Sequence, residues 1–139
     1  MQDFNKVRKI VEKSIFPFLE RDIAIKDIYA YGSRLSKFSR KSSDFDMTFI
    51  IDSNEEFEFH GELDNLRLEL KFKNSKNLIN EIKFGELSKA HAYANGKSLD
   101  KNNAQLSRLA NERLANEFEK IRKEIKILNF DVEESLLRH

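Results

Sequence analysis

The residues best suited to chemistry in this sequence are a Gly-Ser pair and, after ten intervening residues, two aspartates that flank a phenylalanine. Asp44 and Asp46 open an apolar segment, so a strand there would place both carboxylates on one face. Their Cα atoms would lie about 7 Å apart. Two carboxylates at that separation can converge on one Mg²⁺, an ion that prefers oxygen ligands and accepts further ones from a triphosphate. The pair therefore predicts a metal site.

The Gly-Ser pair predicts a phosphate-binding turn. Gly32 lacks a Cβ atom, so its backbone can turn sharply and lie close to a ligand. Ser33 adds a hydroxyl group and a backbone N–H where a turn or helix begins. Among the cations of the loop that follows, Arg34 is the preferred phosphate ligand because it adjoins Ser33. The other cations are Lys37, Arg40 and Lys41. The alternative interpretation of all four is an ordinary solvated basic loop.

The elements that must position these residues begin with a helix and a strand. Apolar residues at helical spacing predict a helix from about residue 3 to residue 15, and Pro17 ends it by biasing the preceding residue away from helical angles. The β-branched and aromatic stretch 23–31 predicts a strand that stops at Gly32. The serine-rich stretch 34–43 is then a loop between the Gly-Ser pair and the aspartates.

Two further strands and two helices are predicted after this loop. Residues 45–51 place Phe45, Met47, Phe49 and Ile51 on one face of a strand, and residues 66–72 alternate apolar with charged side chains. The acidic stretch 55–64 between them is interpreted as a solvated excursion. Residues 77–93 are predicted to form one helix, and residues 103–128 a longer amphipathic one. The apolar stripe of the longer helix consists of Leu106, Ala110, Leu114, Phe118, Ile121, Ile125 and Leu128. The order of elements indicates an α/β or α+β domain with a short sheet.

Length and composition limit the class of protein. A chain of 139 residues suits one domain, and 40% hydrophobic residues suffice for its core. A formal net charge of +1 does not favour bulk electrostatic binding of long nucleic acids. The absence of cysteine excludes disulfides and thiolate metal sites, and no apolar run is long enough to span a membrane. We therefore expect a cytoplasmic protein with one domain over residues 1–139, its core at about 20–100 and its C-terminal helix at about 103–129.

The Gly-Ser pair and the two aspartates together resemble a known signature. Tyr31-Gly32-Ser33, followed after ten residues by Asp44-Phe45-Asp46-Met47, is similar to the Gly-Ser…Asp-x-Asp motif of the polymerase-β-like nucleotidyltransferase superfamily. The short chain and the Gly-Ser-Arg opening are most similar to its minimal nucleotidyltransferase (MNT) branch, which includes antitoxins of HEPN/MNT toxin–antitoxin systems. The signature covers residues 29–47. The likeness extends more weakly to about residue 100, where 96–100 resembles the segment that closes the family's core.

The resemblance implies a fold and a set of site residues. The fold is a short mixed β-sheet flanked by helices, the nucleotidyltransferase-like fold. Gly32 and Ser33 would hold the β,γ-phosphates of a nucleoside triphosphate, with ATP the expected one, and Arg34 would assist them. Asp44 and Asp46 would bind Mg²⁺, or Mn²⁺ in its place. A third acid on the adjacent strand normally completes the metal site and helps to activate the attacking hydroxyl group.

Glu69 is the best match for this third acid, because it lies in the middle of the strand 66–72 on its polar face. The family usually has an aspartate there, which is one methylene shorter. The alternative interpretation is a half-exposed strand position that pairs with Arg67 or Lys71. Asp64 is the second candidate for the third acid.

The resemblance also implies an activity, which is metal-dependent transfer of an NMP, with AMP expected, to a hydroxyl acceptor. An RNA-tailing enzyme usually needs a second domain for base recognition, so a small molecule or a protein hydroxyl is favoured as the acceptor. The expected one is a partner protein, a HEPN-type toxin, as in the toxin–antitoxin relatives. One alternative is a non-catalytic antitoxin that acts by binding alone. Another is the catalytic piece of an RNA terminal uridylyl- or adenylyltransferase. The long C-terminal helix is the expected surface for a partner or for a homo-oligomer.

Overall fold

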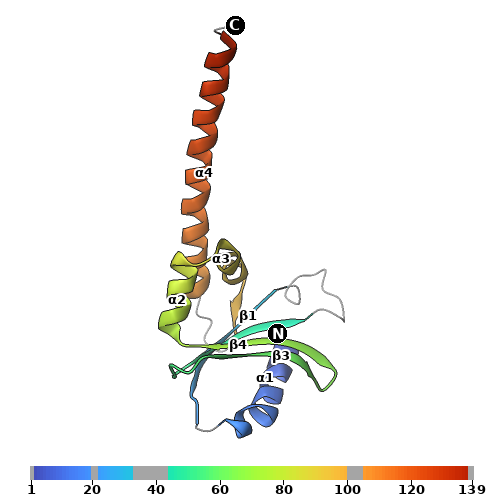
Figure 1. Cartoon of the computed structure of the whole chain (residues 1–139). Coiled ribbons are helices and arrows are strands. Elements are labelled where there is room, and N and C mark those ends of the chain that lie inside the picture. Colours follow the sequence, from blue (N-terminus) through green and yellow to red (C-terminus); the bar gives the residue numbers. More distant parts are fainter. Residues whose placement is uncertain (1, 20–21, 33–43, 100–104, 138–139) are drawn as a thin grey trace.

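A five-stranded mixed sheet forms the centre of the protein (Figure 1). The computed structural model describes residues 2–19, 22–32, 44–99 and 105–137. The strand order across the sheet is β3-β4-β2-β1-β5, so strands that are adjacent in the chain are not always adjacent in the sheet. The strands are β1 (Ile25–Tyr31), β2 (Phe45–Ile51), β3 (Phe57–Leu63), β4 (Leu66–Lys73) and β5 (Lys97–Ser98).

The pairing of β2 with β4 is parallel, whereas the other neighbouring strands pair antiparallel. In this register Asp46 of β2 lies beside Glu69 of β4, and Tyr31 at the end of β1 lies on the other side of Asp46. A parallel pair needs a long crossover connection. The hairpin strand β3 supplies it here, since it carries the chain from the end of β2 back to the start of β4.

One face of the sheet is covered by α1 (Gln2–Ser14), which is followed by the short 3₁₀ turn η1 (Phe16–Phe18). Figure 1 shows α1 on the side of the sheet opposite to the other helices. Its buried residues pack against the alternate apolar side chains of the strands. These contacts confirm the predicted helix and the predicted inward face of β2. The helix ends at Ser14, before Pro17, and Phe16 and Pro17 both lie in the 3₁₀ turn, so the predicted bias of Phe16 away from helical angles is wrong. The buried members of this cluster on β2 are Phe45, Met47, Phe49 and Ile51.

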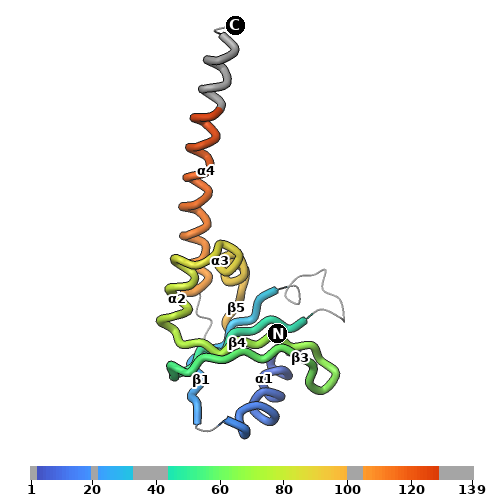
Figure 2. Tube along the Cα trace, in the orientation of Figure 1, coloured from blue at the N-terminus to red at the C-terminus, as the bar shows by residue number. Residues whose placement is uncertain are grey.

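The other face is covered by α2 (Ser75–Phe84), α3 (Leu87–Ala94) and the first part of α4 (Gln105–Leu137). Both cartoon and tube place these three helices together, with β5 directly after α3 (Figures 1 and 2). A second apolar cluster joins them to the sheet. Its fully buried or nearly buried members are Tyr29, Tyr31, Ile50, Leu78, Ile82, Ala90, Tyr93, Leu106 and Ala110.

The structure corrects the interpretation of residues 55–64 as a solvated excursion. Residues 57–63 form β3, an edge strand paired with β4 along its whole length. Phe57 and Phe59 pack against the first apolar cluster, and the ring of Phe57 stacks on that of Phe72 at 4.2 Å between centroids. Gly61 stands where the next apolar residue of the alternation would be, so the sequence pattern of the strand is interrupted. Asp64 and Asn65 then both have positive φ, as a two-residue hairpin turn requires.

The single helix predicted for residues 77–93 is also corrected, because two helices occupy this region. Asn74 caps the start of α2, since its side chain accepts a hydrogen bond from the backbone N–H of Asn77. Gly85 ends α2, and a Cβ atom at this position would lie within 3.3 Å of backbone atoms of Glu81. Helical periodicity continues through this glycine, so the sequence pattern alone did not reveal the break.

The C-terminal helix is longer than predicted and extends away from the sheet. Its backbone is helical as far as Leu137, eight residues beyond the expected end at 129. Figure 1 shows the second half of α4 projecting beyond α2 and α3. Leu106 and Ala110 are buried against the body of the protein. The large apolar residues between 115 and 128 are exposed, namely Phe118, Ile121, Ile125, Ile127 and Leu128. Within the described part of the chain, none of the helices has the length and apolar character needed to cross a membrane.

Candidate active site

The predicted carboxylates lie together at one end of the inner strands of the sheet, where β1 ends and β2 begins. Asp46 and Glu69 are register partners on β2 and β4. Thr48, two residues after Asp46, contacts Tyr93 of α3, so the alternate residues of β2 from Asp46 onward face the same side as α3. Asp44 precedes β2 on that face. The structure therefore brings three of the predicted site residues, Asp44, Asp46 and Glu69, to neighbouring positions.

Gly32 fits against the carboxylate of Asp46. Its φ of +84° lies in the left-handed region that glycine adopts without steric cost. A Cβ atom at position 32 would lie 3.0 Å from Cγ of Asp46 and 3.1 Å from its Cβ, and it would collide with Oδ2. The close approach seen here is to a carboxylate of the protein itself. The close approach of a phosphate to Gly32 stays a prediction.

The carboxyl group of Asp46 is held in an environment that disfavours its charge. Burial, a hydrogen bond with Glu69 and the negative charges of Glu69 and Asp44 together raise the pKa of Asp46 from 3.8 to about 7. The positive charge of Lys71 acts in the opposite direction. Carboxylates that repel one another in this way create a position where a cation is stabilised.

Asp44 is paired differently from the other two carboxylates. Nε of Arg67 lies 3.1 Å from Oδ1 of Asp44, and the Arg67 side chain is well exposed. The alternative interpretation of the sequence paired Arg67 with Glu69, but in the structure Arg67 forms an ion pair with Asp44. Exposed ion pairs of this kind contribute about 0–1 kcal/mol, so an incoming ligand can displace Arg67 at small cost.

The donor chemistry of this edge suits a hard divalent cation, because all three candidate groups are carboxylates. Among the residues that the structure describes, no group of three or more His, Asp or Glu side chains is already arranged around one metal position. Asp44 is engaged by its ion pair with Arg67. Asp46 and Glu69 thus offer a paired set of oxygens, and Asp44 becomes available when Arg67 moves.

Beneath the carboxylates lies a buried network of hydroxyl groups that sequence reasoning missed. Thr48 Oγ1 donates a hydrogen bond to Tyr31 Oη at 3.1 Å and lies 2.7 Å from Tyr93 Oη. Burial is the main cause that raises the pKa of both tyrosines. The network links β1, β2 and α3 directly behind Asp46. Its sequence signal was the position of Tyr31 and Thr48 on the polar face that carries the aspartates.

An open pocket of about 540 Å³ adjoins the carboxylates on the β3 side. His60 lies in it as the register partner of Glu69, and its Nε2 is 2.9 Å from Oε2 of Glu58. The hydrogen bond to His60 lowers the pKa of Glu58. His60 is not among the residues predicted for the site from the sequence. The lining residues are Asp44, His60, Gly61, Glu62, Arg67, Leu68 and Glu69.

The remaining predicted site residues divide into two groups. Asp64, the second candidate for the third acid, lies in the hairpin turn between β3 and β4, where it adopts the positive φ that such a turn requires. It does not line the pocket beside the carboxylates. The other residues, Ser33, Arg34, Lys37, Arg40 and Lys41, lie outside the described residues.

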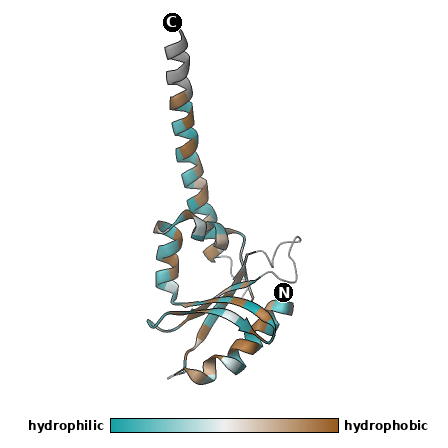
Figure 3. Cartoon of the chain, turned by 45° about the vertical axis from the view of Figure 1, so that its right-hand side comes forward, coloured by the Kyte–Doolittle hydropathy of each residue, from teal (hydrophilic) through white to brown (hydrophobic). Residues whose placement is uncertain are grey.

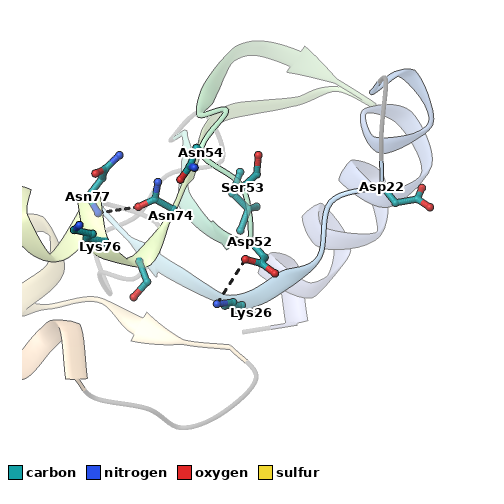
Figure 4. Close-up of a pocket in the computed structure, with 10 residues that line it drawn as sticks. Asp22, Lys26, Asp52, Ser53, Asn54, Asn74, Lys76 and Asn77 are labelled. Atoms are coloured by element: carbon teal, nitrogen blue, oxygen red, sulfur yellow. Dashed lines mark hydrogen bonds and ion pairs between the residues drawn. The ribbon is translucent and has the colours of Figure 1, made fainter.

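A polar pocket of about 810 Å³ lies at the opposite end of β2, close to the start of α2 (Figure 4). Its lining includes Asp52 and Lys26, whose charged groups are 3.9 Å apart, and Asn74 at the start of α2. Strand β2, at about 3.3 Å per residue, separates this pocket from Asp46 by most of its length. None of the predicted site residues lines it.

The comparison with known families agrees with this geometry. The family model described as "Polymerase beta, Nucleotidyltransferase" matches residues 13–104, which is more than half of the chain. The matched region contains Gly32, the three carboxylates and all five strands. No curated protein matches the chain. By this match the chain belongs to the polymerase-β-like nucleotidyltransferase superfamily.

Proposed function

We propose that this protein transfers a nucleoside monophosphate, AMP in the first instance, from a triphosphate to a hydroxyl group of a partner protein. The observation that carries the proposal is the register of β2 and β4, which sets Glu69 beside Asp46 at the edge where Gly32 contacts the Asp46 carboxylate. This arrangement joins the Gly-Ser turn to an acidic pair across two strands that are far apart in the sequence.

The proposal gives Asp44 and Asp46 the role of metal ligands, and it gives Glu69 both this role and that of proton acceptor. Mg²⁺, or Mn²⁺, when bound by Asp44, Asp46 and Glu69, would neutralise charge on the triphosphate. Gly32 and Ser33 would hold the β,γ-phosphates. Glu69 is exposed on the pocket side, so its carboxylate can accept the proton of the acceptor hydroxyl. The acceptor oxygen then bonds to the α-phosphorus, the bond from that phosphorus to the β-phosphate oxygen breaks, and pyrophosphate leaves.

The pocket on the β3 side is the position proposed for the acceptor. It is open, adjoins Glu69 and carries both acidic and basic side chains, among them Glu62 and Arg67. Such a mixed surface suits a polypeptide segment better than a polyanionic RNA. The near-neutral charge of the whole chain supports the same choice. A HEPN-type toxin, as in the relatives that the signature resembles, is the proposed partner.

The test is incubation with each labelled NTP and Mg²⁺, with and without proteins that co-purify from the source. We expect label from ATP to move onto a protein. Asp46→Asn should reduce the transfer by at least about a hundredfold, since its carboxylate is central to the site. Asp52→Asn is the matched control, because this exposed aspartate follows the same strand at the opposite edge. Equal transfer by the Asp46→Asn variant, or no transfer from any NTP, would contradict the proposal.

A second candidate function is an antitoxin that neutralises its partner by binding alone. The Arg67–Asp44 ion pair favours it, because it occupies one carboxylate of the site. Neutralisation of the partner by the double variant Asp44→Asn, Asp46→Asn separates the two candidates. Full neutralisation supports binding alone, whereas loss supports catalysis. Label that appears instead on an RNA primer would point to an RNA nucleotidyltransferase.

A further inference from the structure

The projecting half of α4 carries an apolar stripe that the rest of the described chain does not cover. Phe118, Ile121, Ile125 and Leu128 are 65%, 50%, 51% and 62% exposed. Figure 3 shows hydrophobic residues recurring along this part of the helix, beyond α2 and α3. Isolated surface hydrophobics are ordinary, but a regular row on a projecting helix is typical of an association surface.

The spacing of the stripe is that of a coiled coil. From Leu114 the apolar residues follow at intervals of four, three, four and three, through Phe118, Ile121, Ile125 and Leu128. This pattern repeats every seven residues and fills the a and d positions, with Phe118 and Ile125 at a. A repeat of 3.5 residues per turn keeps one narrow seam facing one partner helix. A helix packed on a globular body would show a wider apolar face.

The charges beside the stripe favour pairing with a second copy of the chain in parallel orientation. Glu117 occupies a g position, and Arg122, five residues later, occupies the next e position. In a parallel, in-register pair each Glu117 faces Arg122 of the other copy, giving two pairs of opposite charge. An antiparallel pair instead faces g with g and e with e, so it forms neither of these pairs. The exposed i,i+3 ion pairs that now hold these side chains, Glu117 with Lys120 and Arg122 with Glu119, are weak and can exchange.

We propose that two copies of this chain associate as a parallel coiled coil through residues 114–128 of α4. The coil begins directly after the part of α4 that packs on the body, where Arg113 donates a hydrogen bond to the carbonyl of Ile82. Both sheets therefore lie at the same end of the coil. This association follows from the heptad pattern of residues 114–128 and the charges beside it, and it does not depend on nucleotidyl transfer.

The association is tested by sedimentation velocity of the full chain over a range of concentrations. We expect a monomer–dimer equilibrium, and Ile121→Asn with Ile125→Asn should weaken it by at least about tenfold, since each removes a buried apolar side chain from the seam. Ile127→Asn is the matched control, because Ile127 is 62% exposed but lies at a c position, off the seam. A monomer at every concentration, or equal dimerisation by the seam variant, would overturn the proposal.

The orientation is tested in two further ways. Glu117→Arg alone and Arg122→Glu alone should weaken the dimer, and the double exchange should restore it, because the pairs reform with reversed charge. The chain contains no cysteine, so Leu128→Cys introduces a unique thiol at the far d position. Parallel helices place the two thiols together, and oxidation should then give a covalent dimer. A dimer that does not cross-link through Leu128→Cys would refute the parallel arrangement.

Discussion

At the scale of single residues, the positions of the carboxylates depend on close contacts with neighbouring side chains and with Gly32. Gly32 leaves space for the Asp46 carboxylate, and Asp46 in turn shares a hydrogen bond with Glu69. Thr48 joins the hydroxyl groups of Tyr31 and Tyr93 directly behind them. Small changes at these positions are therefore expected to affect the carboxylates before they affect the fold.

Gly32→Ala should be strongly unfavourable, for two reasons. Its φ of +84° costs an L-residue about 1–2 kcal/mol, and the added methyl group collides with the Asp46 carboxylate. We expect the free energy of unfolding in urea to fall by about 1–3 kcal/mol, and transfer activity to fall at least about tenfold. Gly61→Ala is the control for stability, since its methyl group would meet only the ring of Phe59, at 3.3 Å. Equal losses of stability at both glycines would contradict the explanation.

The raised pKa of Asp46 predicts a pH dependence of stability in the metal-free protein. Folding raises this pKa from 3.8 to about 7. The contribution of protonated Asp46 to the free energy of unfolding is therefore fully present below pH 3.8 and is lost as the pH rises through about 7. Asp46→Asn cannot ionise and should lack this loss. Relative to the wild type, the variant should gain on the order of 1 kcal/mol between pH 4 and pH 8, allowing for solvent screening. Urea denaturation in EDTA measures the difference, and parallel pH profiles would disprove it.

At the scale of elements, the site is made by the crossover that places β4 parallel to β2. The chain leaves β2, forms the edge strand β3 and returns along β4, so Glu69 arrives beside Asp46. The helices α2 and α3 then bring Tyr93 over Thr48. The first part of α4 holds these two helices in place through the second apolar cluster.

Arg113 is expected to stabilise the junction of α2 and α4. The carbonyl groups in the last turn of a helix lack partners within the helix, and Nη1 of Arg113 donates to one of them, that of Ile82, at 2.9 Å. Arg113→Ala should lower the free energy of unfolding by about 1–2 kcal/mol and leave nucleotidyl transfer unchanged. Arg108→Ala, an exposed arginine on the same helix, serves as the control in the same urea titration. An equal effect of both changes would show that the hydrogen bond contributes nothing specific.

At the scale of the whole molecule, the sheet separates two apolar clusters and leaves the carboxylates at an open edge. The helix α4 extends from this body and carries its own apolar seam (Figures 1 and 3). The proposed nucleotidyl transfer and the proposed association therefore use separate surfaces. Ligand binding at the carboxylates should be measurable as an increase in the stability of the entire domain.

Mg²⁺ with ATP should raise the melting temperature of the wild type and of Asp52→Asn. At a free ligand concentration of about 100 Kd the stabilisation is about 2.7 kcal/mol. The double variant Asp44→Asn, Asp46→Asn should show little or no shift, because it lacks two of the proposed metal ligands. Differential scanning fluorimetry with and without EDTA measures both. An equal shift in the double variant would place the nucleotide elsewhere.

The sequence by itself determined the local features of this protein. The alternation of apolar residues predicted the central strands β2 and β4 and the inward face of β2, because side chains alternate along a strand wherever the strand lies. The spacing of Gly32, Asp44 and Asp46 predicted the family that the match over residues 13–104 establishes.

The tertiary structure alone decided how these local features combine. Strand order, the parallel pairing of β2 with β4 and the pairing of Arg67 with Asp44 join residues distant in the sequence, and no local pattern encodes them. Edge strand β3 was missed because Gly61 interrupts its apolar alternation. The break at Gly85 was missed because apolar periodicity continues across it. The raised pKa of Asp46 has the same origin, since burial and the approach of Glu69 exist only once the sheet has formed.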